Sequence, residues 1–263
     1  MGRIEGIFSD LAKLRKKALV GYIVSGDPDV STTLEAMHLM VKEGVHVLEL
    51  GVAFSDPMAE GPSIQKGHER ALSNNISLIQ TLELVNTFRE KDEKTPVVLM
   101  GYMNTFEAIG SKSFSIKAKE SGVDGILIVD MPLEESEQFS EHTSQNGIDL
   151  IRLIAPTTEE SRIRKICSKA SGYIYYISLK GITGANSINP VEVKNRVSKL
   201  KELTDLPIVI GFGIKDGKSA STMRNLADGV VVGSALVDIM GGNKDEIGNH
   251  LSIKIKNLLE GLS

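Results

Sequence analysis

Eight short apolar runs recur along the chain, and a stretch with helical spacing of apolar residues follows each of them. The runs are 18–24 (ALVGYIV), 46–52 (HVLELGV), 96–102 (PVVLMGY), 125–130 (GILIVD), 150–155 (LIRLIA), 173–179 (YIYYISL), 207–213 (PIVIGFG) and 229–235 (GVVVGSA). Continuous apolar runs of this kind are typical of parallel strands that are buried on both faces. Eight strand-helix units in succession predict an α/β fold, the (β/α)8 TIM barrel; a doubly wound open sheet is the alternative.

The segments between these runs predict the helices of the barrel. Residues 3–16 have apolar side chains at helical spacing and predict an extra N-terminal helix before the first strand. Further helices are expected at 31–43, with Ser31 as the cap, at 77–91, near 105–121, over 159–170, and from Pro190 onward. The 263 residues suit one such barrel, and no linker or low-complexity tract divides them. We therefore expect a single (β/α)8 domain over 1–263.

Composition excludes several classes of partner. The net charge of -4 and the pI near 5.8 give no basic field, so neither nucleic acid nor a membrane surface is expected as a partner. The first residues lack the apolar core of a signal peptide and no long apolar span follows, which favours a cytoplasmic protein. The single cysteine, Cys167, is expected to be a buried structural thiol. No spacing of His, Cys or carboxylates resembles a metal site.

Two carboxylates stand out around the second strand. Glu49 lies inside an apolar run, where an ionised carboxylate needs a partner or a function. Glu60 follows in a loop bounded by Pro57 and Pro62, whose restricted backbone could carry it back over the strand end. Two acids in different surroundings can supply a proton donor and a proton acceptor at one pH. The alternative is that these carboxylates only cap a helix or form salt bridges.

Side-chain alternation along the strands predicts which residues surround Glu49. If Glu49 points into the barrel, Tyr173, Tyr175 and Ile177 in the sixth strand have the matching parity. Because even-numbered strands share layers in this fold, Glu49, Leu127, Tyr175 and Val231 are expected to form one layer with a single acid and a single phenol. Burial there would raise the pKa of Glu49 and keep it partly protonated near neutral pH. Tyr175 is therefore a catalytic candidate beside Glu49 and Glu60, and simple core packing is the alternative interpretation.

Glycine-rich segments after the last three strands suggest an anion site. The segments are 180–187 (KGITGANS), 211–214 (GFGI) and 232–235 (VGSA). The loops after strands seven and eight commonly bind phosphate in this fold, and Gly213, Gly233 and Ser234 are the expected donors. Tight turns alone would also explain these glycines. Neither a P-loop nor a complete dinucleotide fingerprint is present, so no nucleotide is expected.

The sequence resembles the tryptophan synthase alpha subunit family. The segment 49–67 (ELGVAFSDPMAEGPSIQKG) is the most specific match, and SGDPD, GYMN, VDMPLEES, APTT, GITGA and GFGI follow in the expected order. The resemblance implies cleavage of indole-3-glycerol phosphate into indole and glyceraldehyde 3-phosphate, a retro-aldol lyase reaction of tryptophan biosynthesis. It also implies a beta subunit as partner, in an alpha2beta2 heterotetramer. The chain itself is then expected to need no cofactor, since pyridoxal phosphate belongs to the beta subunit.

The resemblance assigns roles to residues of this chain. It implies that Glu49 is the general acid for the indole ring carbon, and that Glu60 binds the indole N–H. The other implied contacts, on the indole, lid and phosphate sides, are Tyr22, Met100, Leu127, Tyr175, Phe212, Thr183, Gly184, Gly213, Gly233 and Ser234. Asp56, Pro57 and Asn104 are implied to face the partner. Two positions depart from the family pattern, since Glu60 replaces a commoner aspartate and Ala53 a frequent proline.

Three other functions remain open from the residues alone. A Schiff-base aldolase would use Lys180 at the end of the sixth strand, although its parity opposes that of Tyr175. A phosphosugar isomerase would need acids at other strand ends, and the end of the fifth strand has none. The barrel could also serve only as a non-catalytic activating subunit.

Overall fold

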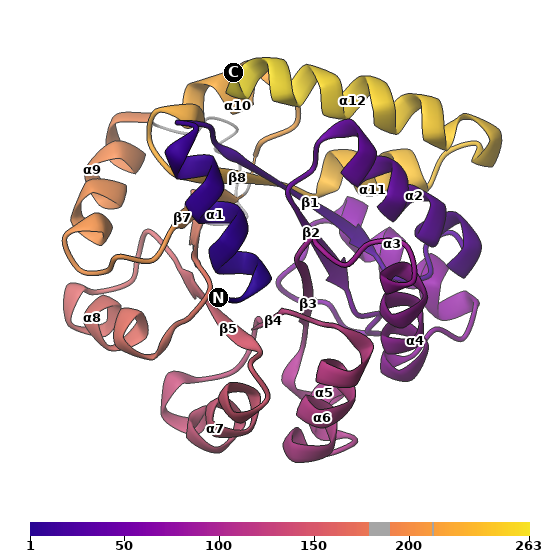
Figure 1. The fold of residues 1–263 in the computed structure, drawn as a ribbon, viewed down its shortest axis with the longest axis horizontal. Helices are drawn as coiled ribbons and strands as arrows, with labels where there is room; N and C mark the ends of the chain where they lie inside the picture. The colour runs from indigo at the N-terminus through magenta and orange to yellow at the C-terminus, as the bar shows by residue number, and fades with distance from the viewer. Residues whose placement is uncertain (179–189, 212) are drawn as a thin grey trace.

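Eight parallel strands close into a barrel in the computed structural model, which describes residues 1–178, 190–211 and 213–263 (Figure 1). The strands are β1 Ala18–Val24, β2 Val47–Gly51, β3 Val97–Gly101, β4 Gly125–Ile128, β5 Asp149–Ile154, β6 Ile174–Ile177, β7 Ile208–Gly211 and β8 Gly229–Val232. Each strand pairs in parallel with the next, and β8 pairs with β1. The predicted barrel is confirmed, and the open doubly wound sheet is wrong.

Helices surround the barrel, as Figure 1 shows. The α-helices are α1 Arg3–Lys13, α2 Val30–Glu43, α3 Pro62–Ser73, α4 Leu78–Arg89, α5 Met103–Glu107, α6 Ser111–Ser121, α7 Glu137–Gln145, α8 Glu160–Lys169, α9 Pro190–Lys201, α10 Gly217–Arg224, α11 Ser234–Met240 and α12 Ile247–Leu262. Two short 3₁₀ helices, η1 Leu133–Glu135 and η2 Lys244–Glu246, precede α7 and α12. The single helix expected near 105–121 is in fact the pair α5 and α6, separated at Gly110 with φ 78°.

Helix α3 was not expected from the sequence. Its buried residues are Gly67, His68 and Ala71, which are small or polar and give little apolar periodicity. Its start signal is nevertheless present, because Pro62 occupies the first turn, where a missing N–H costs nothing. This helix carries the chain from the loop that contains Glu60 back along the barrel.

The cap expected for α2 was placed two residues too late. Asp29 is the N-cap, and its carboxylate accepts the Thr32 N–H at 2.8 Å. Ser31 instead donates its hydroxyl to the same carboxylate at 2.7 Å. An aspartate cap is stronger here because the negative charge also meets the positive end of the helix dipole.

The inner face of the barrel forms one apolar cluster. It includes Val20, Val47, Val98, Leu127, Ile151, Tyr173, Tyr175, Val209 and Val231, each from a position that alternates inward. A second cluster, with Leu48, Leu50 and Leu99 among its members, packs between the strands and the helices. The parity predicted for Leu127, Tyr175 and Val231 is therefore confirmed.

Helix α1 packs across the N-terminal end of the barrel, in front of the strands in Figure 1. Ile4, Phe8 and Leu11 belong to the inner cluster, and the Phe8 ring centroid lies 5.7 Å from that of Tyr173. Arg3 donates to Asp124 at 2.8 Å. The predicted N-terminal helix thus fills the base of the barrel, so a ligand site belongs at the opposite end.

Three remaining sequence-based expectations concern thiols, metals and membranes. Cys167 is buried in α8, and burial raises the pKa of its thiol, as for a structural cysteine. Among the described residues, no group of three or more His, Cys, Asp or Glu is arranged to hold a metal ion. Across the same parts of the chain, every helix is too short or too polar to cross a bilayer.

Candidate functional site

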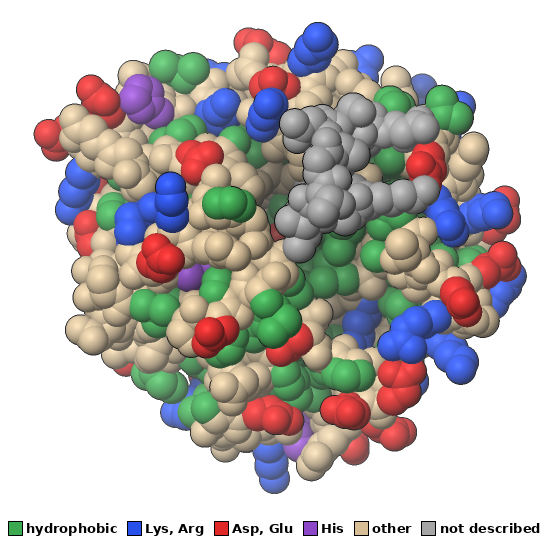
Figure 2. Space-filling view, turned by 180° about the vertical axis from the view of Figure 1, so that it is seen from behind, with side chains coloured by type: hydrophobic (Ala, Val, Ile, Leu, Met, Phe, Trp, Pro, Cys, Tyr) green, Lys and Arg blue, Asp and Glu red, His purple; other side chains and the backbone are tan. Residues whose placement is uncertain are grey.

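A small cavity of about 90 Å³ lies at the C-terminal end of the barrel. Seven predicted site residues line it: Tyr22, Glu60, Met100, Tyr175, Gly213, Gly233 and Ser234. Gly61, Ile64, Ile214 and Val231 complete the lining. Figure 2 shows this end of the molecule, where hydrophobic side chains gather near the middle of the face. The cavity is mostly apolar with a carboxylate on one side, which suits an aromatic ligand that has one polar edge.

Glu49 lies in β2, opposite Tyr22 of β1 and Val98 of β3, and is fully buried. The Tyr173 hydroxyl donates to its Oε1, whereas Oε2 has no hydrogen-bond partner among the described residues. Burial raises the pKa of Glu49 to about 7, and the charge of Glu60 adds to the rise, although the Tyr173 hydrogen bond opposes it. The carboxyl is therefore able to give or take a proton near neutral pH.

Glu60 lines the cavity at the C-terminal ends of the strands, and its charge acts on the Glu49 carboxyl. It is 9% exposed, and burial raises its pKa to about 7. Within the described ranges, neither Glu49 nor Glu60 is in an ion pair, and Gly61 rather than Glu60 is the N-cap of α3. The interpretation as caps or salt-bridge partners is therefore wrong for both. Two coupled acids with raised pKa values share one proton most readily near neutral pH.

Three aromatic side chains that the sequence did not single out hold the loop with Glu60 in place. The Tyr102 hydroxyl accepts the Ala59 N–H at 3.1 Å, and its ring stacks on Phe54 at 4.9 Å between centroids. His68 Nδ1 accepts the Phe54 N–H at 3.2 Å. The sequence gives no local signal for these contacts, because each partner lies far away along the chain. The loop is thus positioned by Tyr102, the residue after β3, and by His68 of α3.

The predicted layer of four residues is only partly right. Leu127, Tyr175 and Val231 share the barrel interior with Glu49, but the phenol bonded to Glu49 belongs to Tyr173. Alternation predicts which face a residue occupies, whereas the stagger between neighbouring strands decides its level along the barrel axis. Tyr173 is thus a further functional candidate that the sequence analysis did not single out, despite its correct parity.

Glycines at two strand ends make room for the ring hydroxyls of the cavity. A Cβ at Gly51 would lie 2.1 Å from the Tyr22 hydroxyl, and one at Gly211 would lie 2.1 Å from the Tyr175 hydroxyl. Both tyrosines are buried, and burial raises the pKa of each hydroxyl. The charges of Glu49 and Glu60 raise these pKa values further. The two hydroxyls therefore lie in the electrostatic range of both acids.

The three residues predicted to bind phosphate, Gly213, Gly233 and Ser234, line the other side of the cavity. Gly213 has φ 76°, which requires glycine, and Gly233 and Ser234 lie at the start of α11. Their place in the lining brings the ends of β7 and β8 to the same cavity as Glu60. The other predicted contacts, Thr183, Gly184 and Phe212, lie outside the described residues, as does Lys180.

The residues implied to face a partner differ in exposure. Asp56 and Asn104 are exposed, whereas Pro57 is buried within the chain. Met58, next to Pro57, is 78% exposed. Asp56 and Met58, in the loop after β2, and Asn104, after β3, are therefore available at the surface, whereas the proline is not.

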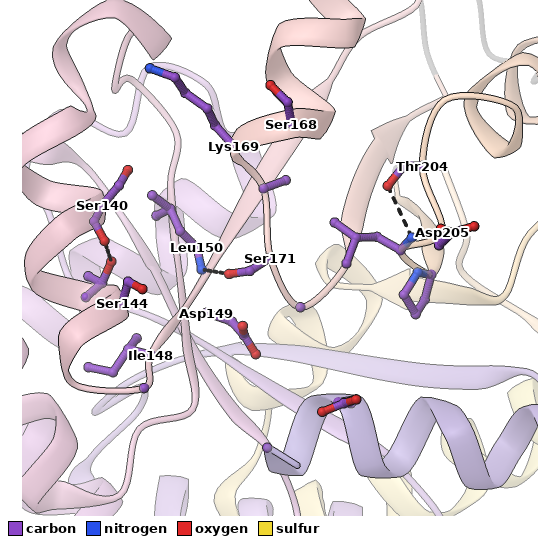
Figure 3. A pocket seen from close by; sticks show the side chains of 18 of the residues that line it. Ser140, Ser144, Ile148, Asp149, Leu150, Ser168, Lys169, Ser171, Thr204 and Asp205 are labelled. Carbon is purple, nitrogen blue, oxygen red and sulfur yellow. Dashed lines mark hydrogen bonds between the residues drawn. The ribbon is translucent and has the colours of Figure 1, made fainter.

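A larger hollow of about 1090 Å³ lies beside helix α1, away from the two acids. Figure 3 shows it between α1, α7, the end of α8 and the loop before β7, with Ser140, Asp149, Ser171 and Thr204 around it. None of the predicted site residues lines it. Its lining mixes Ser and Thr hydroxyls with apolar and charged side chains, and the Ser171 hydroxyl already accepts the Leu150 N–H at 2.8 Å. Size alone therefore does not locate the chemistry in this barrel.

Comparisons with known proteins agree with this geometry. The sequence model described as "Tryptophan synthase alpha chain" matches residues 8–260. The tryptophan synthase alpha chain of Thioalkalivibrio sulfidiphilus is 49% identical over 90% of this chain and 90% of its own, and that of Marinobacter nauticus is 44% identical over 100% and 98%. A crystal structure of the alpha subunit from Legionella pneumophila str. Paris superimposes with a TM-score of 0.92 at 38% identity, covering 100% of this chain and 98% of that one. The resemblance found in the sequence is confirmed, and the chain belongs to the tryptophan synthase alpha chain family.

Proposed function

We propose that this chain is the lyase that cleaves indole-3-glycerol phosphate into indole and glyceraldehyde 3-phosphate, the alpha reaction of tryptophan biosynthesis. One observation carries the proposal: the carboxyls of Glu49 and Glu60, both with raised pKa values, lie within electrostatic range of each other at the C-terminal end of the barrel, and neither is paired with a cation among the described residues. Such a pair is costly for folding and useful for proton transfer.

The proton balance of the reaction can be closed by one carboxyl. Glu49 in its acid form gives a proton to the ring carbon that bears the glycerol chain. The carbon-carbon bond then breaks, its electrons return to the ring, and the chain hydroxyl becomes an aldehyde as it loses its proton. That released proton restores the acid form of Glu49, so no proton is gained or lost overall. Each positioned transfer is typically worth about 10² to 10⁴ in rate.

Glu60 acts on the opposite edge of the indole in this proposal. While Glu49 holds the shared proton, Glu60 carries the negative charge, and it accepts the indole N–H as positive charge develops in the ring. Tyr22, Met100 and Tyr175 then form the walls around the ring. Leu127 supports Met100 from the neighbouring strand position.

The phosphate end of the substrate is assigned to the glycine side. Backbone N–H groups of Gly213, Gly233 and Ser234 are the donors, and the start of α11 favours negative charge. Thr183, Gly184 and Phe212 complete the predicted set of substrate contacts. Binding at this remote end holds the reacting carbon near Glu49, so that part of the binding energy accelerates the chemical step.

We further propose that the chain works in the cytoplasm with a beta subunit, in an alpha2beta2 assembly. The exposed rim residues Asp56, Met58 and Asn104 lie beside the cavity and support such a contact. Solved structures titled tryptophan synthase, from M. tuberculosis and Pyrococcus furiosus, are among the similar folds, at 27% and 36% identity. Pyridoxal phosphate belongs to the partner in this proposal, and the alpha chain uses no cofactor of its own.

The direct test is product analysis with the purified chain, alone and with a beta subunit. Indole and glyceraldehyde 3-phosphate should form in equal amounts from indole-3-glycerol phosphate. Failure to form indole under both conditions would contradict the proposal. Because the chain has no Trp, fluorescence of an indole ligand can be followed without intrinsic Trp background. Borohydride trapping separates the rival mechanism, because a covalent adduct at Lys180 would indicate a Schiff-base aldolase.

A further inference from the structure

His68 connects the loop of one acid to a wall of the cavity. Its Nδ1 accepts the Phe54 N–H at 3.2 Å, and its Nε2 lies 3.4 Å from the Tyr22 hydroxyl oxygen. The ring is 2% exposed, so both contacts are shielded from water. Phe54 belongs to the loop that leads to Glu60, whereas Tyr22 belongs to β1. One side chain of α3 therefore contacts two parts of the site.

The Phe54 contact fixes the tautomer of His68. An N–H donor needs a bare ring nitrogen, so the proton of the neutral ring must be on Nε2. Burial lowers the pKa of His68 to about 4, so the ring is neutral at ordinary working pH. Nε2–H then points at the Tyr22 oxygen and donates to it, at a distance near the long end for such a bond.

This donation leaves the Tyr22 hydroxyl hydrogen for another acceptor. The Tyr22 hydroxyl lies against the backbone of Gly51 and lines the same cavity as Glu60. The charges of Glu60 and Glu49 both contribute to raising the pKa of Tyr22, with Glu60 the larger of the two. A hydroxyl whose oxygen already accepts from His68 is left to act as a donor on the side of the acids.

We propose that His68 is a positioning residue: its Nε2–H orients the Tyr22 hydroxyl as a donor into the cavity, and its Nδ1 holds the loop that carries Glu60. This inference rests on the proposed function, because the oriented hydroxyl serves the ionised acid and the ligand edge next to it. An oriented donor at this point favours the state in which Glu60 is charged and Glu49 is protonated.

Two amide substitutions can separate the two contacts. In His68→Asn the amide oxygen can take the place of Nδ1, but the side chain is too short to reach Tyr22. In His68→Gln the amide can take the place of Nε2, but it leaves the Phe54 N–H without its acceptor. Tyr22→Phe removes the hydroxyl alone. We expect His68→Asn and Tyr22→Phe each to lower kcat about fivefold to tenfold.

The decisive measurement is the double variant His68→Asn with Tyr22→Phe. If His68 acts through the Tyr22 hydroxyl, the double variant should have about the same kcat as Tyr22→Phe alone. Losses that multiply, to about 25- to 100-fold, would overturn the proposal. His68→Gln should keep kcat closer to the wild type while raising KM, because it loosens the loop and keeps the donor. Thermal unfolding of each variant checks that the measured protein is folded.

A second measurement does not depend on activity. Nitrogen NMR of histidine-labelled protein reports which ring nitrogen carries the proton, and the His68 signal among the five histidines is identified by its loss in His68→Asn. We expect a bare Nδ1 and a protonated Nε2 that do not titrate between about pH 5 and 8. A proton on Nδ1, or titration near 6.5, would overturn the proposal. A wild type that shows the expected tautomer and no indole formation would instead contradict the proposed function.

Discussion

The two ends of the barrel treat buried carboxylates in opposite ways. At the N-terminal end, Asp124 accepts from Arg3 at 2.8 Å and from Arg89 at 2.7 Å, and it also accepts the Val97 N–H at 2.8 Å. At the C-terminal end, Glu49 has one bond on Oε1 and none on Oε2 among the described residues. Both side chains are at most 9% exposed. The difference lies in their partners, not in their burial.

The contrast shows that buried carboxylates at one end of the barrel stabilise the fold, whereas those at the other end are suited to proton transfer. A carboxylate with two guanidinium partners ties α1 and α4 to the strands through charge-assisted hydrogen bonds. A carboxyl without a cation is costly to ionise, so its pKa rises into the range where protons can be exchanged. The ion pairs at the base of the barrel therefore contribute to stability. At the other end, the buried carboxyl of Glu49 makes the folded state less stable when it is ionised.

The largest expected effect is on catalysis at the rim. Glu49→Gln should lower kcat for indole release by about 10² to 10⁴, because the amide cannot give the proton. Binding of an indole ligand should persist, and the free energy of unfolding at pH 8 should be unchanged or higher, since a buried ionisable group has been removed. Indole release and chemical denaturation are the two measurements. Full turnover by Glu49→Gln would show that Glu49 is not the acid.

The matched change at the base should act on stability instead. Asp124→Ala leaves Arg89 buried without its main partner and should lower the free energy of unfolding by about 3 kcal/mol. Asp124→Asn serves as the control, since its amide oxygen can still accept the Val97 N–H and should restore part of the loss. Urea denaturation gives both values. In the folded fraction, kcat should stay near that of the wild type; a loss of kcat as large as in Glu49→Gln would contradict the division between the two ends.

The pH dependence of stability sharpens the comparison. The folded-state pKa of Glu49 is raised to about 7 from an ordinary value of 4.5. Between these values the unfolded chain loses the proton and the folded chain keeps it, so the free energy of unfolding falls as pH rises. The stabilisation of the folded state by the protonated Glu49 carboxyl is complete below pH 4.5, and it is lost as the pH rises through 7. The stability of Glu49→Gln relative to the wild type should therefore increase across this window, as measured by denaturation at several pH values; a constant difference would contradict the raised pKa.

Tyr173→Phe tests the hydrogen bond that the Glu49 carboxyl accepts within the described part of the chain. The Tyr173 hydroxyl lowers the pKa of Glu49, so its removal should raise that pKa further. The limb of the pH-rate profile that reports loss of the acid should move to higher pH. A profile that moves to lower pH, or does not move, would show that the bond does not act on the ionised form.

The smallest expected effect concerns a buried charge that belongs to neither end. Arg152 in β5 is 6% exposed, its Nε has no partner, and its one hydrogen bond within the described residues goes to Ser140 at 3.4 Å. Burial lowers its pKa. Arg152→Met should raise the free energy of unfolding by about 1 kcal/mol without changing kcat. A drop in stability would indicate that this guanidinium is better paired than its contacts suggest.

The barrel could be predicted from the sequence because each of its strands lies in an unbroken run of apolar residues. The prediction succeeded at β1, where the run and the strand coincide over 18–24. It failed at α3, whose buried face is made by Gly67, His68 and Ala71 and so lacks an apolar stripe. Local pattern reports a helix only when hydrophobic burial, rather than polar contact or close packing, shapes its inner face.

The candidate site divides in the same way. Glu49 and Glu60 could be singled out because a carboxylate in an apolar run and a carboxylate between prolines are both unusual. Tyr173 and His68 could not, because their importance comes from partners 124 and 14 residues away. Alternation placed Tyr173 on the correct face, but the stagger of the strands, which the sequence does not encode locally, decided which tyrosine reaches the acid.

The helix across the base of the barrel has a further consequence for how ligands reach and leave the cavity. Ile4, Phe8 and Leu11 of α1 occupy that end with apolar side chains, and the cavity lies at the other end. In the proposed reaction the substrate therefore arrives, and both products leave, at the C-terminal end of the barrel. A subunit bound over that end would control when the products are released and where they go.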